Sequence, residues 1–170
     1  MVRPRRPEEM DTAQGGGVIF SQGAHQIDIV RLLGGGLVRS VRAQCGNWDP
    51  SRPTEGAYSA LLTFADDVFA SCTYSGYAHF DSDEFMGFIG EMGLPKDRSR
   101  YGAMRKALRE ANNSAQESAL KAARNYGGSA YVPPAGAPAD RRHQHFGSII
   151  VSCERADLRP TADGVMIYDD

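Results

Sequence analysis

The stretch GGGVIFSQGAHQIDIVRLLGGG, residues 15–36, decides the fold. A glycine triplet stands at each end, and the run between them is mostly apolar but contains His25 and Asp28. Apolar residues at spacings of three and four predict a helix over residues 22–33. These residues cover most of the circumference, so we expect a mostly buried helix with one narrow polar sector at Asp28 and Arg31. The second triplet predicts the helix end, because glycine adopts the left-handed conformation at little cost.

Short alternating runs outside this helix predict antiparallel strands. Residues 57–64 and 68–77 flank a short acidic turn and predict a hairpin with one packed and one more polar face. Further strands are expected at 37–45, at 83–93 and in the runs FGSIIVSC, ADLRPT and VMIYDD, with a hairpin turn at Asp163-Gly164.

A second helical period runs from residue 100 to residue 126 and predicts one long helix. Residues 127–145 are rich in glycine, proline and alanine and predict a flexible loop. We expect residues 1–170 to form a single domain, with residues 1–14 as a lead-in arm. The pattern predicts the α+β class, with an open, mainly antiparallel sheet and helices packed on one face.

Composition and charge exclude several classes of protein. The chain has 170 residues and a net charge of −2, so it lacks the basic field that binds nucleic acid or an anionic membrane. No apolar run approaches the ~20 residues of a membrane span, and the start does not resemble a secretory signal. Cys45, Cys72 and Cys153 predict reduced, buried thiols and a cytoplasmic location. We expect a small-molecule substrate, with neither a nucleic acid nor a membrane as partner.

His25 is the first candidate for chemistry. A histidine near the start of a helix can direct its ring into a cleft and transfer protons near neutral pH. Asp28, one turn later, would orient that ring or stabilise its charged form. The alternative is a hydrogen-bonded core histidine, with Asp28 paired to Arg31. The glycine triplets do not match a GxGxxG or GxxxxGK[ST] motif, so the sequence shows no nucleotide-binding loop.

Two further groups contain histidine. In GYAHFDSDE, His79 and Asp81 follow a predicted strand, although the chemistry of these residues alone favours a solvated acidic loop. In RRHQHF, His143 and His145 follow two arginines, a composition that suits a carboxylate-bearing ligand rather than a metal. We therefore expect no metal, and a metal-dependent protein that uses these three histidines is the alternative.

The sequence resembles a known family. GGGVIFSQGAHQIDIVRLLGG is similar to the segment that opens the substrate-side domain of Gfo/Idh/MocA oxidoreductases. RPRRPEEMDTAQGGGVIF, GYAHFD and HFGSIIVSCERADLRP resemble the 4,5-dihydroxyphthalate dehydrogenases (phthalate cis-dihydrodiol dehydrogenases) among its members. The resemblance covers nearly the whole chain, and it implies a dihydrodipicolinate-reductase-like C-terminal domain.

The resemblance also implies roles for single residues. Gly23, His25 and Asp28 match the family's G-x-H-x-x-D helix, and His25 falls on its catalytic histidine. Ser21 stands where many members carry an aspartate. The expected substrate-binding residues are Ser21, Gln22, Asp28, His79, Asp81, His143 and His145.

The implied activity is hydride transfer from a cyclic dihydrodiol or polyol to NAD or NADP, as in aromatic degradation. The family binds that cofactor mainly through an N-terminal Rossmann domain, which we expect to precede this chain. The chain alone should then bind little cofactor and be inactive, and it should form a homo-oligomer through its sheet face. A non-catalytic binding or assembly module with the same fold is the alternative.

Overall fold

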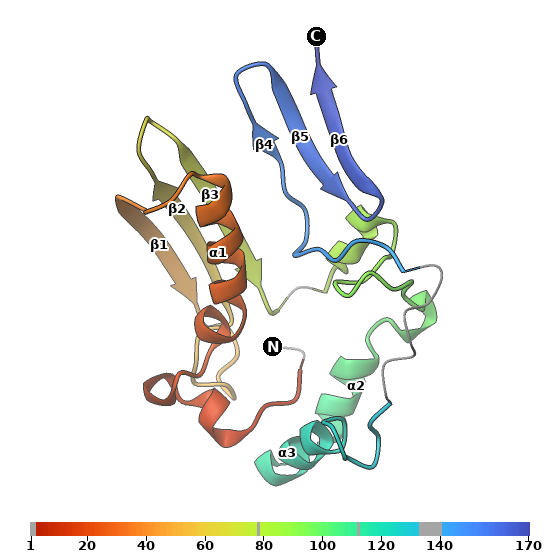
Figure 1. Cartoon of the computed structure of the whole chain (residues 1–170). Coiled ribbons are helices and arrows are strands. Elements are labelled where there is room, and N and C mark those ends of the chain that lie inside the picture. The colour runs from red at the N-terminus through yellow and green to blue at the C-terminus, as the bar shows by residue number, and fades with distance from the viewer. Residues whose placement is uncertain (1–2, 78, 112, 133–140) are drawn as a thin grey trace. The chain divides into compact units, whose positions relative to one another are not determined.

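The computed structural model describes residues 3–77, 79–111, 113–132 and 141–170 (Figure 1). The chain divides into two compact units, the first formed by residues 1–78 and 103–132 and the second by residues 79–102 and 133–170. Each sheet has three strands, in the orders β1-β2-β3 and β4-β5-β6. Among the described residues, every helix lacks the length or the apolar character needed to span a bilayer.

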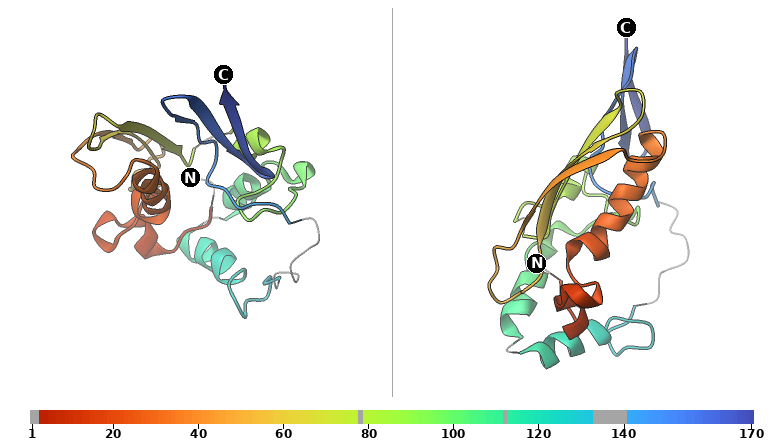
Figure 2. Two further views of the ribbon diagram at one scale, coloured as in Figure 1. Left: turned by 45° about the horizontal axis from the view of Figure 1, so that its top comes forward. Right: turned by 90° about the vertical axis from the view of Figure 1, so that its left-hand side faces the viewer.

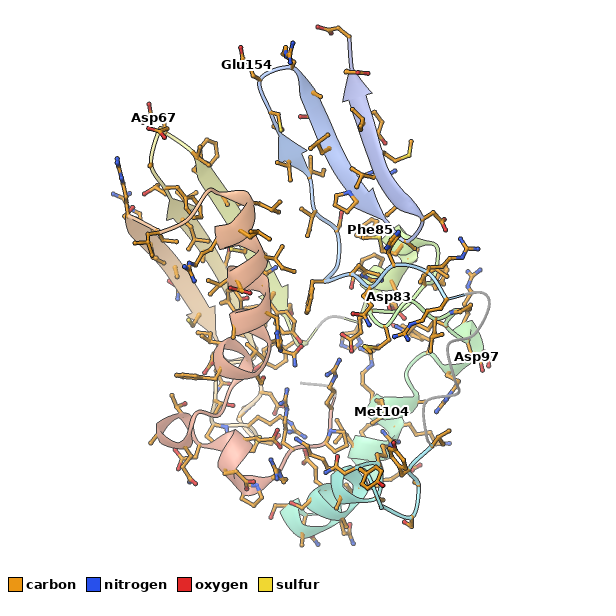
Figure 3. The ribbon with its side chains drawn as sticks, in the orientation of Figure 1. Asp67, Asp83, Phe85, Asp97, Met104 and Glu154 are labelled. Carbon is orange, nitrogen blue, oxygen red and sulfur yellow. The ribbon has the colours of Figure 1, made fainter. Side chains whose placement is uncertain are left out.

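The first unit is built on an antiparallel sheet of β1 (Ser40–Gly46), β2 (Ala57–Thr63) and β3 (Phe69–Ser75). The predicted hairpin is confirmed, and Figure 3 labels Asp67 at its tip. Asp66 and Asp67 have φ angles of 56° and 60°. Two positive φ values in succession match the right-handed twist of the flanking strands, which is why a tight turn forms here.

The core of the first unit lies on one face of this sheet. Its buried members are Val18, Tyr58, Ala60, Leu62, Phe64 and Cys72. The opposite face of β3 carries Phe69, Ser71, Thr73 and Ser75, all exposed. The expected division into a packed and a more polar face is therefore confirmed.

Helix α1 (Ala24–Leu33) lies along the packed face, as Figures 1 and 2 show. A single π turn, Ile19–Gly23, precedes it, and the second glycine triplet ends it as predicted. The expectation of a mostly buried helix is wrong, because no residue of α1 is buried and Leu32 is 80% exposed. A three-stranded sheet covers only a narrow stripe of the helix, in which Val30 packs on the core.

The predicted long helix over residues 100–126 is also wrong, because the structure has two helices there. They are α2 (Ala103–Glu110) and α3 (Ser114–Ala122). The Asn113 side chain accepts the N–H of Gln116 at 2.9 Å and so caps the start of α3. An asparagine cap needs extended backbone, which interrupts the helical run at that residue.

A partly buried ion pair and a backbone hydrogen bond join three distant segments of the first unit. The residues predicted as a lead-in arm form short 3₁₀ turns at Pro7–Met10 and Thr12–Gln14. Nη1 and Nη2 of Arg52 bond the Glu117 carboxylate, at 2.9 and 3.0 Å. The backbone N–H of Arg5 also donates to Glu117, at 2.6 Å. The start of the chain, the loop before β2 and α3 are thereby held together.

The second unit contains β4 (Val151–Ser152), β5 (Ala156–Thr161) and β6 (Gly164–Asp169). The hairpin between β5 and β6 is present, but its turn lies one residue earlier than predicted, at Ala162-Asp163, because Gly164 already pairs with Thr161. The strand predicted over 83–93 is wrong. Residues Ser82–Met86 form a 3₁₀ turn, in which Figure 3 labels Asp83 and Phe85. The Asp81 side chain caps that turn, and Gly87 and Phe88 have φ angles near +60°, so the chain cannot remain extended.

Two smaller expectations have mixed outcomes. Cys72 is buried as predicted, but Cys45 and Cys153 are exposed. Cys45 lies on the edge strand β1, whose residues are nearly all exposed. In the predicted loop 127–145, residues 133–140 lie outside the described residues, and the others contain no helix or strand.

Candidate functional site

His25 lies in the first turn of α1, immediately after the π turn, and its side chain is exposed. In the π turn the N–H of Ala24 donates to the carbonyl of Ile19, five residues earlier. Such single-turn π segments are rare and often occur at functional sites. The turn inserts one residue into the helical register, so it changes the direction in which the following side chains point.

A carboxylate supports the start of this turn. Glu55 Oε1 accepts the N–H of Ile19 at 3.0 Å. Gly17 makes room for it, since a Cβ on that glycine would lie 2.1 Å from the same oxygen. Gly17 also has a φ of +99°, which side-chain-bearing residues rarely adopt. The last glycine of the first triplet therefore gives space to Glu55.

A buried tyrosine supports the end of the π turn. Tyr58 is 5% exposed, and its hydroxyl donates to Gln26 Oε1 at 2.6 Å. Gln26 Nε2 in turn donates to the carbonyl of Thr73 on β3, at 3.4 Å. Burial, followed by the nearby Cys72 and Tyr74, raises the pKa of Tyr58 to about 12, so its hydroxyl keeps its proton.

The remaining candidates of the first unit lie on the same short segment. The Ser21 hydroxyl donates to the carbonyl of Gly17 at 2.7 Å, within the π turn. Gln22 is half-buried, and Asp28 is exposed one turn after His25. Ser21, Gln22, His25 and Asp28 thus form one local group, and Tyr58 and Glu55 provide its support from the sheet side.

In the second unit, Asp81 belongs to an ion-pair cluster. Lys96 Nζ lies 2.7 Å from Asp81 and 2.8 Å from Asp83. Burial opposes ionisation of Asp81, but the bonds from Lys96 and the Asp83 N–H outweigh it and lower the Asp81 pKa. Burial likewise opposes the charge of Lys96, while the two carboxylates raise the Lys96 pKa. Asp81 is therefore a charged partner of Lys96.

His145 is buried among backbone groups. Its Nε2 lies 2.8 Å from the carbonyl of Ile89, and its Nδ1 accepts the N–H of Gly147 at 3.1 Å. A carbonyl only accepts and an amide N–H only donates, so in these two bonds Nε2 donates and Nδ1 accepts. Asp83 Oδ1 lies 4.0 Å from the same nitrogen. Both ring nitrogens are engaged, an arrangement typical of a structural histidine.

His79 and His143 are exposed. Arg141 donates to the carbonyl of Met92, and Arg142 forms an ion pair with Asp163, so the positive charge beside His143 has an acidic partner. No three His, Cys, Asp or Glu side chains of the described residues gather closely enough to hold a metal ion.

Sequence reasoning missed the supporting residues Gly17, Gln26, Glu55 and Tyr58. The first glycine triplet gave a signal for Gly17, because glycine often marks a position where another part of the chain approaches the backbone closely. Glu55 and Tyr58 gave none, since their contacts join residues 36 and 32 positions apart.

Comparison with known proteins identifies the kind of domain. The profile of the GFO/IDH/MocA C-terminal domain matches residues 2–94, more than half of the chain. A 1-carboxy-3-chloro-3,4-dihydroxycyclohexa-1,5-diene dehydrogenase from Comamonas testosteroni is 46% identical over 170 residues, which are 99% of this chain and 42% of the relative.

A solved structure agrees with this relationship. The crystal structure of a protein from Bordetella bronchiseptica RB50 that is named as a dehydrogenase matches this chain with a TM-score of 0.85 and 42% sequence identity. It covers 99% of this chain, which spans 42% of that protein. This chain therefore spans less than half the length of the proteins it matches. The matches to sequence and structure together show that the chain belongs to the GFO/IDH/MocA C-terminal domain family.

Proposed function

We propose that this chain is the substrate-facing domain of a cytoplasmic NAD(P)-dependent dehydrogenase, in which His25 carries the proton. The observation that supports this most is the position of His25, exposed in the first turn of α1 directly after a braced π turn. An imidazole in that setting can exchange a proton with a bound molecule near neutral pH.

The proposed reaction is oxidation of a secondary alcohol. The hydroxyl proton goes to His25, and the carbon–hydrogen bond breaks with its electron pair, leaving a carbonyl. When bound, a nicotinamide cofactor supplies the acceptor for that hydride. The first glycine triplet lies between a 3₁₀ turn and a π turn rather than after a strand, and its last member, Gly17, lies against the Glu55 carboxylate. These glycines do not fit a pyrophosphate, so this chain would meet the cofactor from the substrate side.

For the substrate we propose a cyclic dihydrodiol, with a ring carboxylate as in phthalate-type diols. The Comamonas relative is named for a carboxylated cyclohexadiene diol, and the matched region covers this whole domain. Orientation of such a rigid ring against His25 would supply much of the rate, because the ring diol has few internal rotations to lose.

A chimera tests this proposal. This chain would replace the matching 42% of the Comamonas relative, and oxidation of that relative's diol would be followed by NADH or NADPH absorbance. We expect an active chimera, and loss of at least about 100-fold in kcat with His25→Ala. Asp28→Asn serves as a comparison on the same helix. Full activity of the His25→Ala chimera would reject His25 as the proton carrier.

We also propose that the chain self-associates through a sheet face. Val151, Leu158 and Ile167 lie opposite one another across β4, β5 and β6, on one face. On the same face Val165 is 58% and Ile167 is 60% exposed. Apolar surface of this kind is commonly covered by a partner. Light scattering of the chain and of Ile167→Lys tests this, and a monomer in both cases would reject it.

A further inference from the structure

We propose that Tyr58 is a positioning residue for His25, acting through Gln26 to fix the rotation of the first turn of α1. This inference rests on the proposed function of His25 and names a group that supports it. The hydroxyl of Tyr58, on β2, bonds the side chain of Gln26 in the helix that carries the candidate site.

The bond between Tyr58 and Gln26 has a defined direction. Gln26 Nε2 faces the carbonyl of Thr73, which can only accept a hydrogen bond. The amide oxygen of Gln26 therefore faces Tyr58, and the tyrosine hydroxyl must be the donor. The pKa of Tyr58, raised to about 12 by burial, keeps that donor protonated over the range in which proteins are studied.

A second contact places the same hydroxyl against the π turn. A Cβ added to Gly23 would lie 3.1 Å from the Tyr58 hydroxyl oxygen. Residues three apart lie on one face of a helix, so Gly23 and Gln26 both face Tyr58. The tyrosine thus contacts the end of the π turn and the first turn of α1 together.

The position of His25 follows from this arrangement. Successive helical residues point about 100° apart around the axis, so a fixed Gln26 sets the direction of its neighbour His25. The π turn adds one residue to the register, and Glu55 holds its beginning through Ile19. Tyr58 holds the end of the π turn. Contacts at the start and at the end of this turn therefore fix how far His25 and Asp28 are rotated about the helix axis.

The first test uses this chain, labelled with ¹⁵N, and the ring resonances of its histidines. Tyr58→Phe removes only the donor and keeps the ring. We expect the His25 ring resonances to move or broaden, while those of His143 in the second unit stay fixed. Tyr74→Phe is the matched control, because Tyr74 stacks on Tyr58 from the same face of the sheet and its hydroxyl makes no described bond to α1.

The second test measures kcat and KM in the chimera described above. Tyr58→Phe should lower kcat by about 10- to 100-fold with little change in KM, because a misplaced proton carrier affects the chemical step. Tyr74→Phe should leave both constants near those of the parent. If Tyr58→Phe does not fold, Gln26→Leu removes the acceptor from the partly exposed helix instead.

The outcomes separate this inference from the proposed function. Unchanged His25 resonances in Tyr58→Phe and in Gln26→Leu, with lower stability alone, would overturn the positioning role and leave a structural one. Altered His25 resonances in this chain, together with a chimera that keeps full activity after His25→Ala, would reject the proposed function while supporting the link between Tyr58 and His25.

Discussion

Glu55 Oε1 accepts the N–H of Ile19 at 3.0 Å, which puts a carboxylate from the loop before β2 at the start of the helical segment that carries His25. The N–H of the preceding residue, Val18, donates to the backbone carbonyl of Glu55 at 3.3 Å. A carboxylate at a helix start satisfies an otherwise unpaired donor and opposes the positive end of the helix dipole. The site is therefore built on a contact between two loops as well as on the helix.

Gly17→Ala should destabilise the first unit. The new methyl group would meet the Glu55 carboxylate, and alanine disfavours a φ of +99°. We expect a loss of about 1–3 kcal/mol in the free energy of unfolding. Urea unfolding followed by circular dichroism measures it. The double variant Gly17→Ala, Glu55→Ala removes the clash but not the backbone strain, so it should lose less than the two single effects combined.

Arg52→Ala should destabilise the first unit more. Arg52 is 8% exposed and makes two bonds to Glu117, so its removal leaves a half-buried carboxylate without its main partner. Breaking a fully buried pair costs about 3–5 kcal/mol, and we expect a loss toward the lower end of that range because the Glu117 side chain is 16% exposed. Arg52→Lys keeps the charge but cannot bond both carboxylate oxygens in one plane. Its stability should therefore lie between that of Arg52→Ala and that of the parent protein. Equal stability of Arg52→Ala and the parent protein would show that the pair contributes nothing.

Local patterns in the sequence sufficed for much of the fold. Alternation across Ala57–Thr63 and Phe69–Ser75 gave the hairpin, and the second glycine triplet gave the end of α1. The break at Asn113 carried a signal too, since asparagine before serine is typical of a helix start. The strand expected at 83–93 failed because the Asp81 cap and the left-handed Phe88 depend on local bonds that alternation does not show.

The site was predictable only in part. His25 and Asp28 stand out because they are polar residues in an apolar helix. The π turn and the contacts that Tyr58 and Glu55 make with this segment did not stand out. These two residues come from β2 and the loop before it, and no short sequence spacing connects them to the turn. Likewise, the spacing of His143 and His145 gave no sign that the two side chains have different environments, one exposed and one bonded to backbone on both nitrogens.

Lys96→Met should change how the stability of the second unit depends on pH. The pKa of Asp81 is lowered from 3.8, so its contribution is present above pH 3.8 and is lost as the pH falls through the lower, folded-state value. The pKa of Lys96 is raised from 10.5, so its contribution is complete below pH 10.5 and is lost as the pH rises through the higher, folded-state value. Thermal unfolding of the parent should show both losses.

In Lys96→Met both of these losses should shrink, because neither carboxylate keeps its cation. Lys106→Met, on α2 of the first unit, is a control of equal charge change. An unchanged pH profile in Lys96→Met would mean that the pair does not stabilise the folded state.

His145→Ala should lower stability and leave ligand binding near that of the parent protein. The variant removes the partners of the Ile89 carbonyl and the Gly147 N–H. A buried group left unpaired costs about 1–3 kcal/mol, and we expect a loss toward the lower end of that range because both residues are half-buried. His143→Ala, two residues earlier and exposed, is the matched control and should leave stability unchanged. Urea unfolding measures the first effect, and the KM of the chimera for its diol measures the second. A large rise in KM with unchanged stability would instead place His145 at the substrate, because a ring that only holds Ile89 and Gly147 together has no direct contact to lose.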